Sequence, residues 1–223
     1  MIKSLTILFF TFSFTSVFSQ QVQGYDLGRE DLVIFPMGMN QKVTIGSISK
    51  NGISFDWDNA NLERFDDLSI YGTDIKNALM FLCYDDDINT LNGGDAKVVK
   101  SGDIYVWKGH SWMGDITNAS SASHNDYLLD DYANNANKGY SIQFFWVSEP
   151  ITFKAQCQTE TSIFSGGFKA VITYDLKLLK GWNMVKKEIL AVQQMDEAAG
   201  VPTKISYTSV ENTDGVTWFF KSF

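Results

Sequence analysis

One stretch near the C-terminus, Phe168–Val192, constrains the fold more than any other part of this 223-residue chain. In its first half every second side chain is apolar; these are Phe168, Ala170, Ile172, Tyr174, Leu176 and Leu178. Period-two alternation is typical of a strand with one buried face. Lys180 and Gly181 then interrupt the pattern, and glycine can adopt the positive φ that a tight turn needs. We therefore expect a long antiparallel hairpin against which the other segments pack.

A second hairpin is expected near the N-terminus, where two alternating segments flank Asn51 and Gly52. An Asn-Gly pair between alternating segments is a strong hairpin signal. Segments with a strand pattern are Asp31–Phe35, Lys42–Ser49, Ile53–Trp57, Ala78–Tyr84, Asp103–Lys108, Tyr140–Val147, Ile151–Cys157, Lys204–Val210 and Val216–Phe220. Ala78–Tyr84 is apolar on both faces, which predicts a central strand covered on both sides. About eleven short strands predict an all-β fold, an antiparallel β-sandwich or, alternatively, a β-barrel.

One or two short helices are expected beside the strands. Asn61 can cap a helix that carries Leu62, Phe65 and Leu68, and a loop fits this segment almost as well. The polar residues from about 110 to 139 predict a long irregular excursion that contains a short helix at Asp126–Asn134.

The segment Met184–Ala199 fits two kinds of secondary structure. Apolar side chains recur at helical spacing, at Val185, Ile189, Val192 and Met195. A strand to about Val192 is the preferred interpretation, because Trp182 and its neighbours must leave the hairpin turn in an extended conformation.

Residues 1–19 have the features of a secretory signal peptide. Lys3 supplies the positive charge, Leu5–Phe18 is the apolar core, and Val17 and Ser19 precede the expected cleavage before Gln20. The apolar core is too short to span a bilayer, and no later segment is long and apolar enough to do so. We expect an exported protein, periplasmic or extracellular, with one β domain over residues 20–223 and no transmembrane segment after cleavage.

Charge and cysteine content restrict the partners and the compartment. The net charge of −8 makes the chain a poor binder of nucleic acids. Cys83 and Cys157 are the two cysteines. In an oxidising compartment they can form a disulfide if their strands are neighbours.

One motif in the first half of the chain and one in the second half resemble a known group of proteins. The residues concerned are Gly46, Ser47, Ile48, Asn51, Gly52, Ile53, Ser54 and Phe55, and then Tyr174, Leu176, Leu178, Gly181, Trp182 and Asn183. This pattern resembles uncharacterised secreted or lipid-anchored all-β proteins of Gram-negative bacteria with a C-terminal Y-x-L-x-L-x-x-GWN hairpin. The resemblance implies a fold but no activity, and the chain departs from it in lacking the lipoprotein cysteine and in carrying the 110–139 excursion.

Metal binding is considered at two places. Asp85, Asp87 and Asn89 have the alternate spacing of calcium ligands, but Thr90 stands where an EF-hand has glycine and Ala96 where it has glutamate. A looser calcium site and a solvated acidic turn are the alternatives, and the acidic turn is preferred. The zinc ligands considered are His110, His124, Asp115 and Asp126, whose spacing does not favour a site. The expectation is no cofactor, with calcium as the alternative.

Aromatic side chains in and after the segment Asp103–Lys108 are the candidate ligand-binding residues. If Ile104 and Val106 face the core, Tyr105 and Trp107 lie together on the opposite face, and Trp112 follows shortly. Aromatic rings with polar neighbours suit sugar rings or the apolar surface of a partner. The structural alternative is that this strand is covered on both sides.

The expected function is a non-enzymatic binding or interaction module of the bacterial envelope, with a glycan or an envelope protein as its partner. No catalytic residue stands out, because the chain has no G-x-S-x-G motif and Cys157 lies on an apolar strand face. The alternatives are a glycan-active hydrolase, whose paired carboxylates the sequence cannot reveal, and a structural component of a surface assembly.

Overall fold

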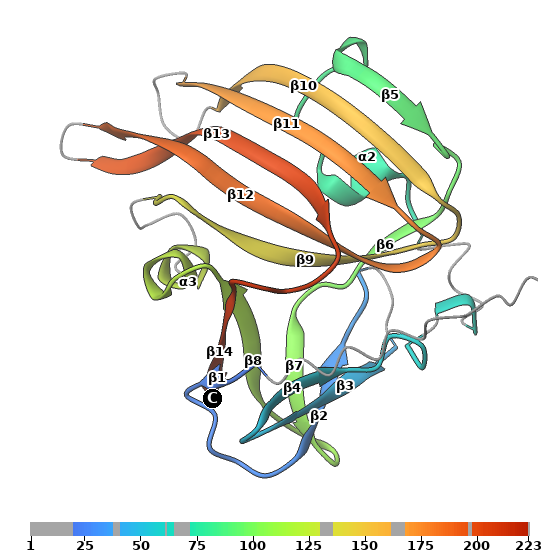
Figure 1. Ribbon diagram of the computed structural model, residues 1–223, viewed down its shortest axis with the longest axis vertical. Coiled ribbons are helices and arrows are strands. Elements are labelled where there is room, and N and C mark those ends of the chain that lie inside the picture. Colours follow the sequence, from blue (N-terminus) through green and yellow to red (C-terminus); the bar gives the residue numbers. More distant parts are fainter. Residues whose placement is uncertain are drawn as a thin grey trace, which may run out of the picture.

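The described residues of the chain form two seven-stranded sheets and a few short helices (Figure 1). The structure is a computed structural model, described for residues 20–37, 41–60, 62–64, 72–129, 136–161, 168–195 and 198–222. The first sheet has the order β1 (Val22–Gln23), β14 (Thr217–Ser222), β8 (Ser111–Ala119), β7 (Ile104–Lys108), β2 (Glu30–Ile34), β3 (Val43–Ser49), β4 (Gly52–Phe55). The second has the order β5 (Ile88–Asn92), β10 (Ile151–Thr161), β11 (Phe168–Leu178), β13 (Ala198–Val210), β12 (Gly181–Met195), β9 (Gly139–Val147), β6 (Val98–Lys100). The helical elements are η1 (Leu62–Arg64), α2 (Ile75–Leu79), η2 (Asp85–Asp87) and α3 (Ala122–Leu129).

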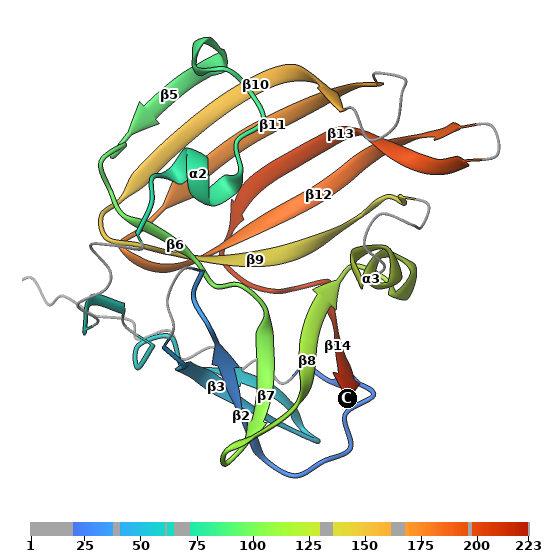
Figure 2. The ribbon, with the colours of Figure 1, turned by 180° about the vertical axis from the view of Figure 1, so that it is seen from behind.

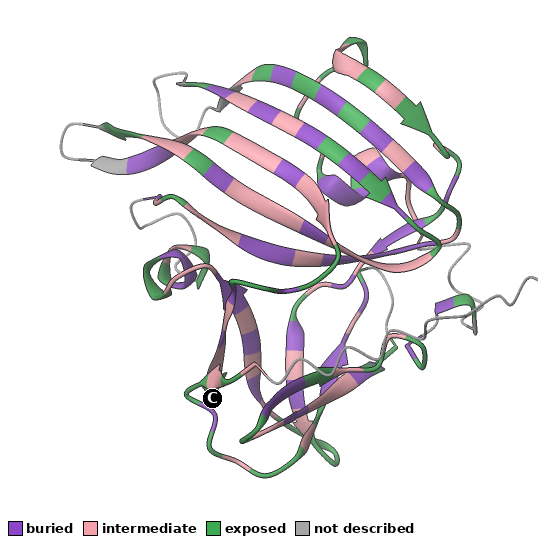
Figure 3. Cartoon of the chain, in the orientation of Figure 1, coloured by how far each residue is buried: buried purple, intermediate pink, exposed green. Residues whose placement is uncertain are grey.

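The all-β prediction is confirmed, and so is the hairpin around Asn51, which joins β3 to β4. Figure 3 shows the expected alternation of buried and exposed residues along β10 and β11. The signal-peptide prediction falls on residues 1–19, outside the described residues. None of the helices among the described residues has the length and apolar character needed to cross a membrane.

The predicted pairing of the C-terminal hairpin is wrong. β11 and β12 follow one another in the chain, but β13 lies between them, parallel to β11 and antiparallel to β12. The turn itself is present: Gly181 has a φ of +96°, and the Asn183 side chain accepts a hydrogen bond from the Leu179 N–H and donates one to the Leu179 carbonyl. The two strands therefore diverge from a tight turn, and β13 fills the space between them.

Short connections between strands that are not neighbours make the second sheet curl. Residues 148–150 join β9 to β10, although β12, β13 and β11 lie between these two strands in the sheet. With three residues between them, Val147 and Ile151 can be at most about 14 Å apart, so the ends of β9 and β10 must approach each other. The strands accordingly converge at this end and fan out at the other (Figure 1).

Strand β9 separates two hydrophobic cores. Phe144 and Trp146 point into the core between the two sheets, and Phe145 and Val147 point into a second core on the opposite side of β9. We call this second side the inner face of the second sheet; α2 lies against it (Figure 2). The strand that is buried on both faces is thus β9.

The prediction that Ala78–Tyr84 is a central strand is wrong. Residues Ile75–Leu79 form α2, whose first turn is capped by the Asp74 carboxylate, an acceptor for the Asn77 N–H at 2.9 Å. Met80 ends the helix in a left-handed conformation with a φ of +53°. The apolar run reflects packing of one helix face on the inner face, because Ile75, Ala78 and Leu79 are buried.

Two other local predictions are resolved. The segment from Met184 is a strand, as preferred, and β12 continues to Met195. The excursion from 110 to 139 is not irregular where it is described, because it contains β8 and α3. A helix is present but begins earlier than expected, at Ala122, and residues 130–134 of the expected helix Asp126–Asn134 lie outside the described residues.

Candidate functional site

The candidate aromatic residues lie where the alternation of β7 places them. Ile104 and Val106 are buried in the core between the sheets. Tyr105 and Trp107 point to the opposite side of the first sheet, and Trp112 is on the adjacent strand β8, where it is the register partner of Trp107. The structure therefore brings the three predicted rings together on the outer face of the first sheet.

The rings form a cluster that is only partly open, because other side chains cover two of them. Phe35 lies 5.5 Å from Tyr105 and 6.3 Å from Trp107, centroid to centroid, and the Lys42 ammonium lies 4.4 Å from the centre of the Trp107 ring. Trp112 packs edge-to-face on Tyr105 at 5.8 Å and stays 46% exposed. Trp112 thus offers the accessible ring, and Tyr105 and Trp107 are half-buried behind it.

Hydrogen bonds fix the orientation of the Trp112 ring. Its indole N–H donates to the Gly114 carbonyl at 3.1 Å and to the Asp115 carboxylate at 3.2 Å. Burial raises the pKa of the Asp115 carboxyl, and the bond from Trp112 offsets part of this effect. Burial also raises the pKa of Tyr105, with Asp103 and Asp115 adding to the shift. The cluster is therefore a pre-oriented aromatic surface bordered by two carboxylates.

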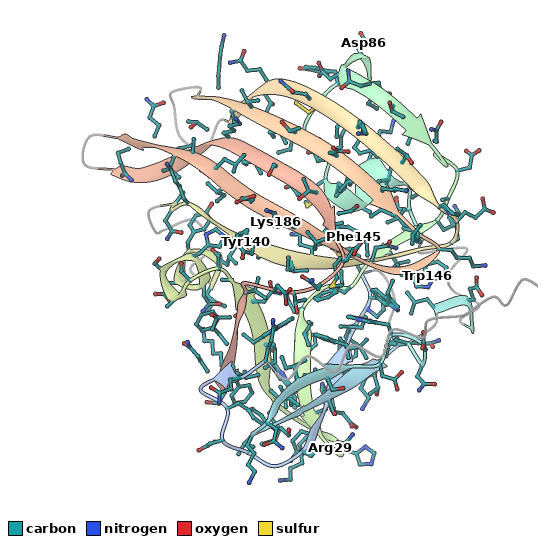
Figure 4. The ribbon with its side chains drawn as sticks, in the orientation of Figure 1. Arg29, Asp86, Tyr140, Phe145, Trp146 and Lys186 are labelled. Atoms are coloured by element: carbon teal, nitrogen blue, oxygen red, sulfur yellow. A yellow bond between two sulfur atoms is a disulfide. The ribbon has the colours of Figure 1, made fainter. Side chains whose placement is uncertain are left out.

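An open groove of about 560 Å³ lies next to this cluster. It crosses the outward side of β2, β3 and β4 and is lined by Arg29, Asp31, Lys42, Val43, Thr44, Gly46, Ser47, Ser54, Asp56 and Asn59. Lys42 belongs to both features, and Asp31 is the register partner of Trp107. Figure 4 shows Arg29 at the end of the first sheet that is remote from the second sheet. Cations, carboxylates, hydroxyls and amides thus line a concave surface beside aromatic rings.

The groove residues were not identified from the sequence. Ser54 and Asp56 alternate with Ile53 and Phe55 in the sequence, and this alternation is the signal that could have placed them on the polar side of the strand. Arg29, Asp31 and Lys42 come from separate segments whose neighbourhood depends on the pairing of β2 with β3 and β7.

A buried polar atom accompanies the aromatic cluster. The indole nitrogen of Trp107 is buried and makes no hydrogen bond; within the described part of the chain only one other side-chain N or O atom, the Tyr174 hydroxyl oxygen, is in this condition. Leaving a buried donor unsatisfied costs about 1–3 kcal/mol. Trp107 therefore carries a buried donor that no described protein group satisfies.

The calcium candidates are engaged with the protein. The Asp85 carboxylate is 3.1 Å from the Lys76 ammonium, and the Asp87 carboxylate accepts the Tyr84 N–H at 2.9 Å. Asn89 is exposed on β5. Calcium needs six to eight oxygen ligands, and these two carboxylates already have partners.

The zinc candidates are not brought together. His110 is exposed in the turn between β7 and β8, whereas His124 is buried in α3. Among the described residues, the one group of three ligand atoms close enough to share a metal ion consists of Cys83, Asp87 and Cys157. These two sulfur atoms are joined in a disulfide, with 5.7 Å between the Cα atoms. The cysteine pairing considered from the sequence is therefore present, and the thiols are not free to bind a metal.

No protein-family model, no curated protein and no solved structure matches this chain. The function must therefore be argued from the groove and the aromatic cluster themselves.

Proposed function

We propose that this chain is an exported, non-enzymatic binding module of the bacterial envelope that recognises a glycan on the outer face of the first sheet. The observation that carries the proposal is the groove of about 560 Å³ with the exposed Trp112 ring beside it. Sugars present apolar ring faces and many hydroxyl groups. Aromatic rings stack on the former, and charged or amide side chains such as those of the groove bind the latter.

Two features support an exported protein. The Cys83–Cys157 disulfide is typical of oxidising compartments such as the periplasm or the cell exterior. The signal-peptide pattern of residues 1–19 points the same way. The resemblance to secreted β proteins of Gram-negative bacteria agrees with this assignment.

Titration of the full chain with a panel of neutral and acidic oligosaccharides, followed by tryptophan fluorescence and calorimetry, tests the proposal. Replacing Trp112 by Ala should weaken binding about tenfold, because one stacked ring is lost. Trp112→Phe keeps a ring and is the matched control; it should retain most of the affinity. Both variants should remain folded, since Trp112 is 46% exposed and lies outside the hydrophobic core between the sheets.

Two results would contradict glycan binding. One is a wild-type chain that binds no member of the panel at millimolar concentration. The other is equal affinity of the wild type and Trp112→Ala for a sugar that does bind. Self-association or capture of an envelope protein through this face would instead favour the structural alternative.

A second candidate, a glycan hydrolase, is favoured by the two carboxylates near Tyr105. Asp103 and Asp115 both raise the pKa of the Tyr105 hydroxyl, and Asp103 also raises the pKa of Asp115. Glycoside hydrolysis needs one protonated and one ionised carboxyl group. If the wild type cleaves a bound oligosaccharide and Asp115→Asn binds it without cleavage, the hydrolase is the correct assignment.

A further inference from the structure

A row of polar side chains crosses the inner face of the second sheet, on neighbouring strands. Lys187 on β12 is the register partner of Ser141 on β9 and of Tyr207 on β13, and Tyr207 is in turn the partner of Tyr174 on β11. We call these four residues the Lys187 row. The rings of Tyr174 and Tyr207 are stacked with their centroids 4.8 Å apart. Ser141, Tyr207 and Tyr174 are buried, so the row lies within the concave side of the curled sheet.

Lys187 has no partner in this row. Its side chain makes no ion pair or hydrogen bond with any residue of the described chain. The adjacent Lys186 points to the other side of the sheet, where its ammonium is 2.7 Å from the Glu188 carboxylate and 5.2 Å from the centre of the Tyr140 ring (Figure 4). Lys186 therefore has a carboxylate partner, whereas the next residue, Lys187, has none among the described residues.

A second lysine lies near the row. Lys100 on β6 is the register partner of Phe145, and its ammonium is 6.0 Å from the centre of that ring. Burial lowers the pKa of Lys100, and the charge of Lys187 lowers it further; burial alone lowers the pKa of Lys187. Each lysine is thus partly desolvated, and the two repel each other.

The other titratable groups that the structure describes near the two lysines do not neutralise them. His124 packs over Gly139 at the end of β9, where an added Cβ would come within 2.7 Å of the imidazole ring, and burial lowers the pKa of His124. Burial raises the pKa of Tyr207, so this hydroxyl stays protonated. Asp103 is the acidic group that acts on Lys100, and its effect is smaller than those of burial and Lys187.

Among the residues that the structure describes, no carboxylate forms an ion pair with Lys187, although the chain is rich in acidic residues. The chain has 26 acidic residues against 18 lysines and arginines, so a counter-ion would be easy to place. Bringing a cation out of water without a partner is costly. An anionic ligand that binds in the folded state would offset this cost.

We propose that the inner face of the second sheet binds a small oxyanion, a carboxylate, sulfate or phosphate group, between Lys187 and Lys100. Tyr207 and Ser141 are the register partners of Lys187, and their hydroxyls would donate hydrogen bonds to the same group. The ammonium nitrogens are not sealed, because neither is among the wholly buried unpartnered atoms. The burial of Ser141 and Tyr207 limits the ligand to a compact one and excludes a polymer such as a nucleic acid. This site is independent of the proposed glycan site, since the two lie on different sheets.

Calorimetric titration of the full chain with sodium acetate, sulfate and phosphate, each at the ionic strength of a sodium chloride control, tests the proposal. At least one anion should bind in preference to chloride, and Lys187→Met should weaken it about ten- to hundredfold, the usual effect of losing one charge-assisted hydrogen bond. Lys186→Met is the matched control, because it removes the same charge one residue away, and it should keep wild-type affinity. Preference for acetate would indicate a planar carboxylate, and preference for sulfate or phosphate a tetrahedral anion.

A second pair of variants guards against a folding defect. Lys187→Arg keeps the charge and should keep binding, whereas Lys100→Met should lose it like Lys187→Met. Without anion, Lys187→Met should melt no lower than the wild type, because it removes an uncompensated charge. The proposal is overturned if the wild type binds none of the three anions above chloride, or if Lys186→Met and Lys187→Met lose affinity equally.

Discussion

At the scale of single residues, Trp182 connects the turn after β11 to the segment that follows β4. Its indole N–H donates to the Ala60 carbonyl at 2.7 Å, and its ring lies 5.2 Å from the Trp57 ring. Trp182 packs against the core between the sheets while remaining partly exposed. One side chain thereby links residues that are 122 positions apart in the chain.

We expect Trp182→Ala to lower the free energy of unfolding by about 3 kcal/mol, because it removes a large ring from a packed site and leaves the Ala60 carbonyl without its donor. Trp182→Phe keeps most of the ring and should cost about 1 kcal/mol, the usual net value of one hydrogen bond. Urea unfolding of the two variants measures both effects. Equal stability of Trp182→Ala and the wild type would show that the contact contributes nothing.

His124 gives a pH-dependent contribution to stability. Burial lowers its pKa below 6.5, and the hydrogen bond with Asn137, 3.0 Å from Nδ1, only partly opposes this. Between the lowered folded value and 6.5, the unfolded chain binds more protons than the folded one, so stability falls as the pH is lowered through this window. The slope from one group is at most about 1.4 kcal/mol per pH unit.

The variant His124→Asn removes the titration while leaving an amide near the position of Nδ1. Its free energy of unfolding should depend less on pH between 7 and the lowered pKa than that of the wild type. Urea unfolding at a series of pH values measures the difference between the two curves. Parallel curves would mean that His124 titrates equally in the folded and unfolded chain.

At the scale of elements, the sequence predicted strands better than their pairing. Alternation along β11 depends only on which side chains are buried, so Ile172, Tyr174 and Leu176 revealed it directly. The insertion of β13 between β11 and β12 leaves no local signal, because it is decided by contacts between distant segments. The same holds for the candidate site. Alternation along β7 predicted on which side of the sheet Tyr105 lies, but it could not predict that Phe35 and Lys42 cover the aromatic cluster.

Helix α2 is the element for which the sequence pattern predicted a strand, and its N-terminal cap explains why a helix forms instead. Asp74 accepts the Asn77 N–H and receives a second bond from the Asn77 side chain at 2.8 Å. Ala78–Tyr84 shows no polar alternation, so a run of apolar residues alone could not distinguish a buried strand from a short helix that packs on a sheet. The deciding residue lies before that run, at Asp74.

Asp74→Ala should therefore lower the free energy of unfolding by about 1 kcal/mol, the usual cost of losing an N-cap. Asp74→Asn can still accept the Asn77 N–H and should retain most of the stability. Thermal unfolding of the two variants under identical conditions makes the comparison. If both lose the same amount, the carboxylate charge matters and the cap does not.

At the scale of the whole molecule, the two cores on either side of β9 make the sheets depend on each other. Phe144 and Trp146 pack in the core between the two sheets, whereas Phe145 and Val147 pack in the core on the inner face of the second sheet. The short link from β9 to β10 fixes the curl, and α2 packs on the inner face of the curled sheet (Figure 2). Sequence patterns predicted a sandwich or a barrel, and the curled second sheet has features of both. The patterns could not decide between them, because the curling of a sheet depends on the order of its strands and on the lengths of the links between them.

The Cys83–Cys157 disulfide links α2 covalently to the second sheet. It joins the segment that follows α2 to β10 across 74 residues of sequence, and so holds α2 against the inner face. A cross-link of that span restricts the unfolded chain and stabilises the fold by about 4 kcal/mol in the chain-entropy model.

The double variant Cys83→Ala/Cys157→Ala should accordingly lose about 4 kcal/mol of unfolding free energy in urea, and the wild type should lose a similar amount when it unfolds with its disulfide reduced. Because the bond also restrains α2, the variant should exchange the backbone amides of Ala78 and Leu79 faster, whereas those of β3 in the first sheet should change less. A thiol assay of the denatured, unreduced protein should detect no free thiol. Two free thiols in protein exported by its host would show that the bond does not form there, and an unchanged urea midpoint in the variant would show that the fold does not depend on it.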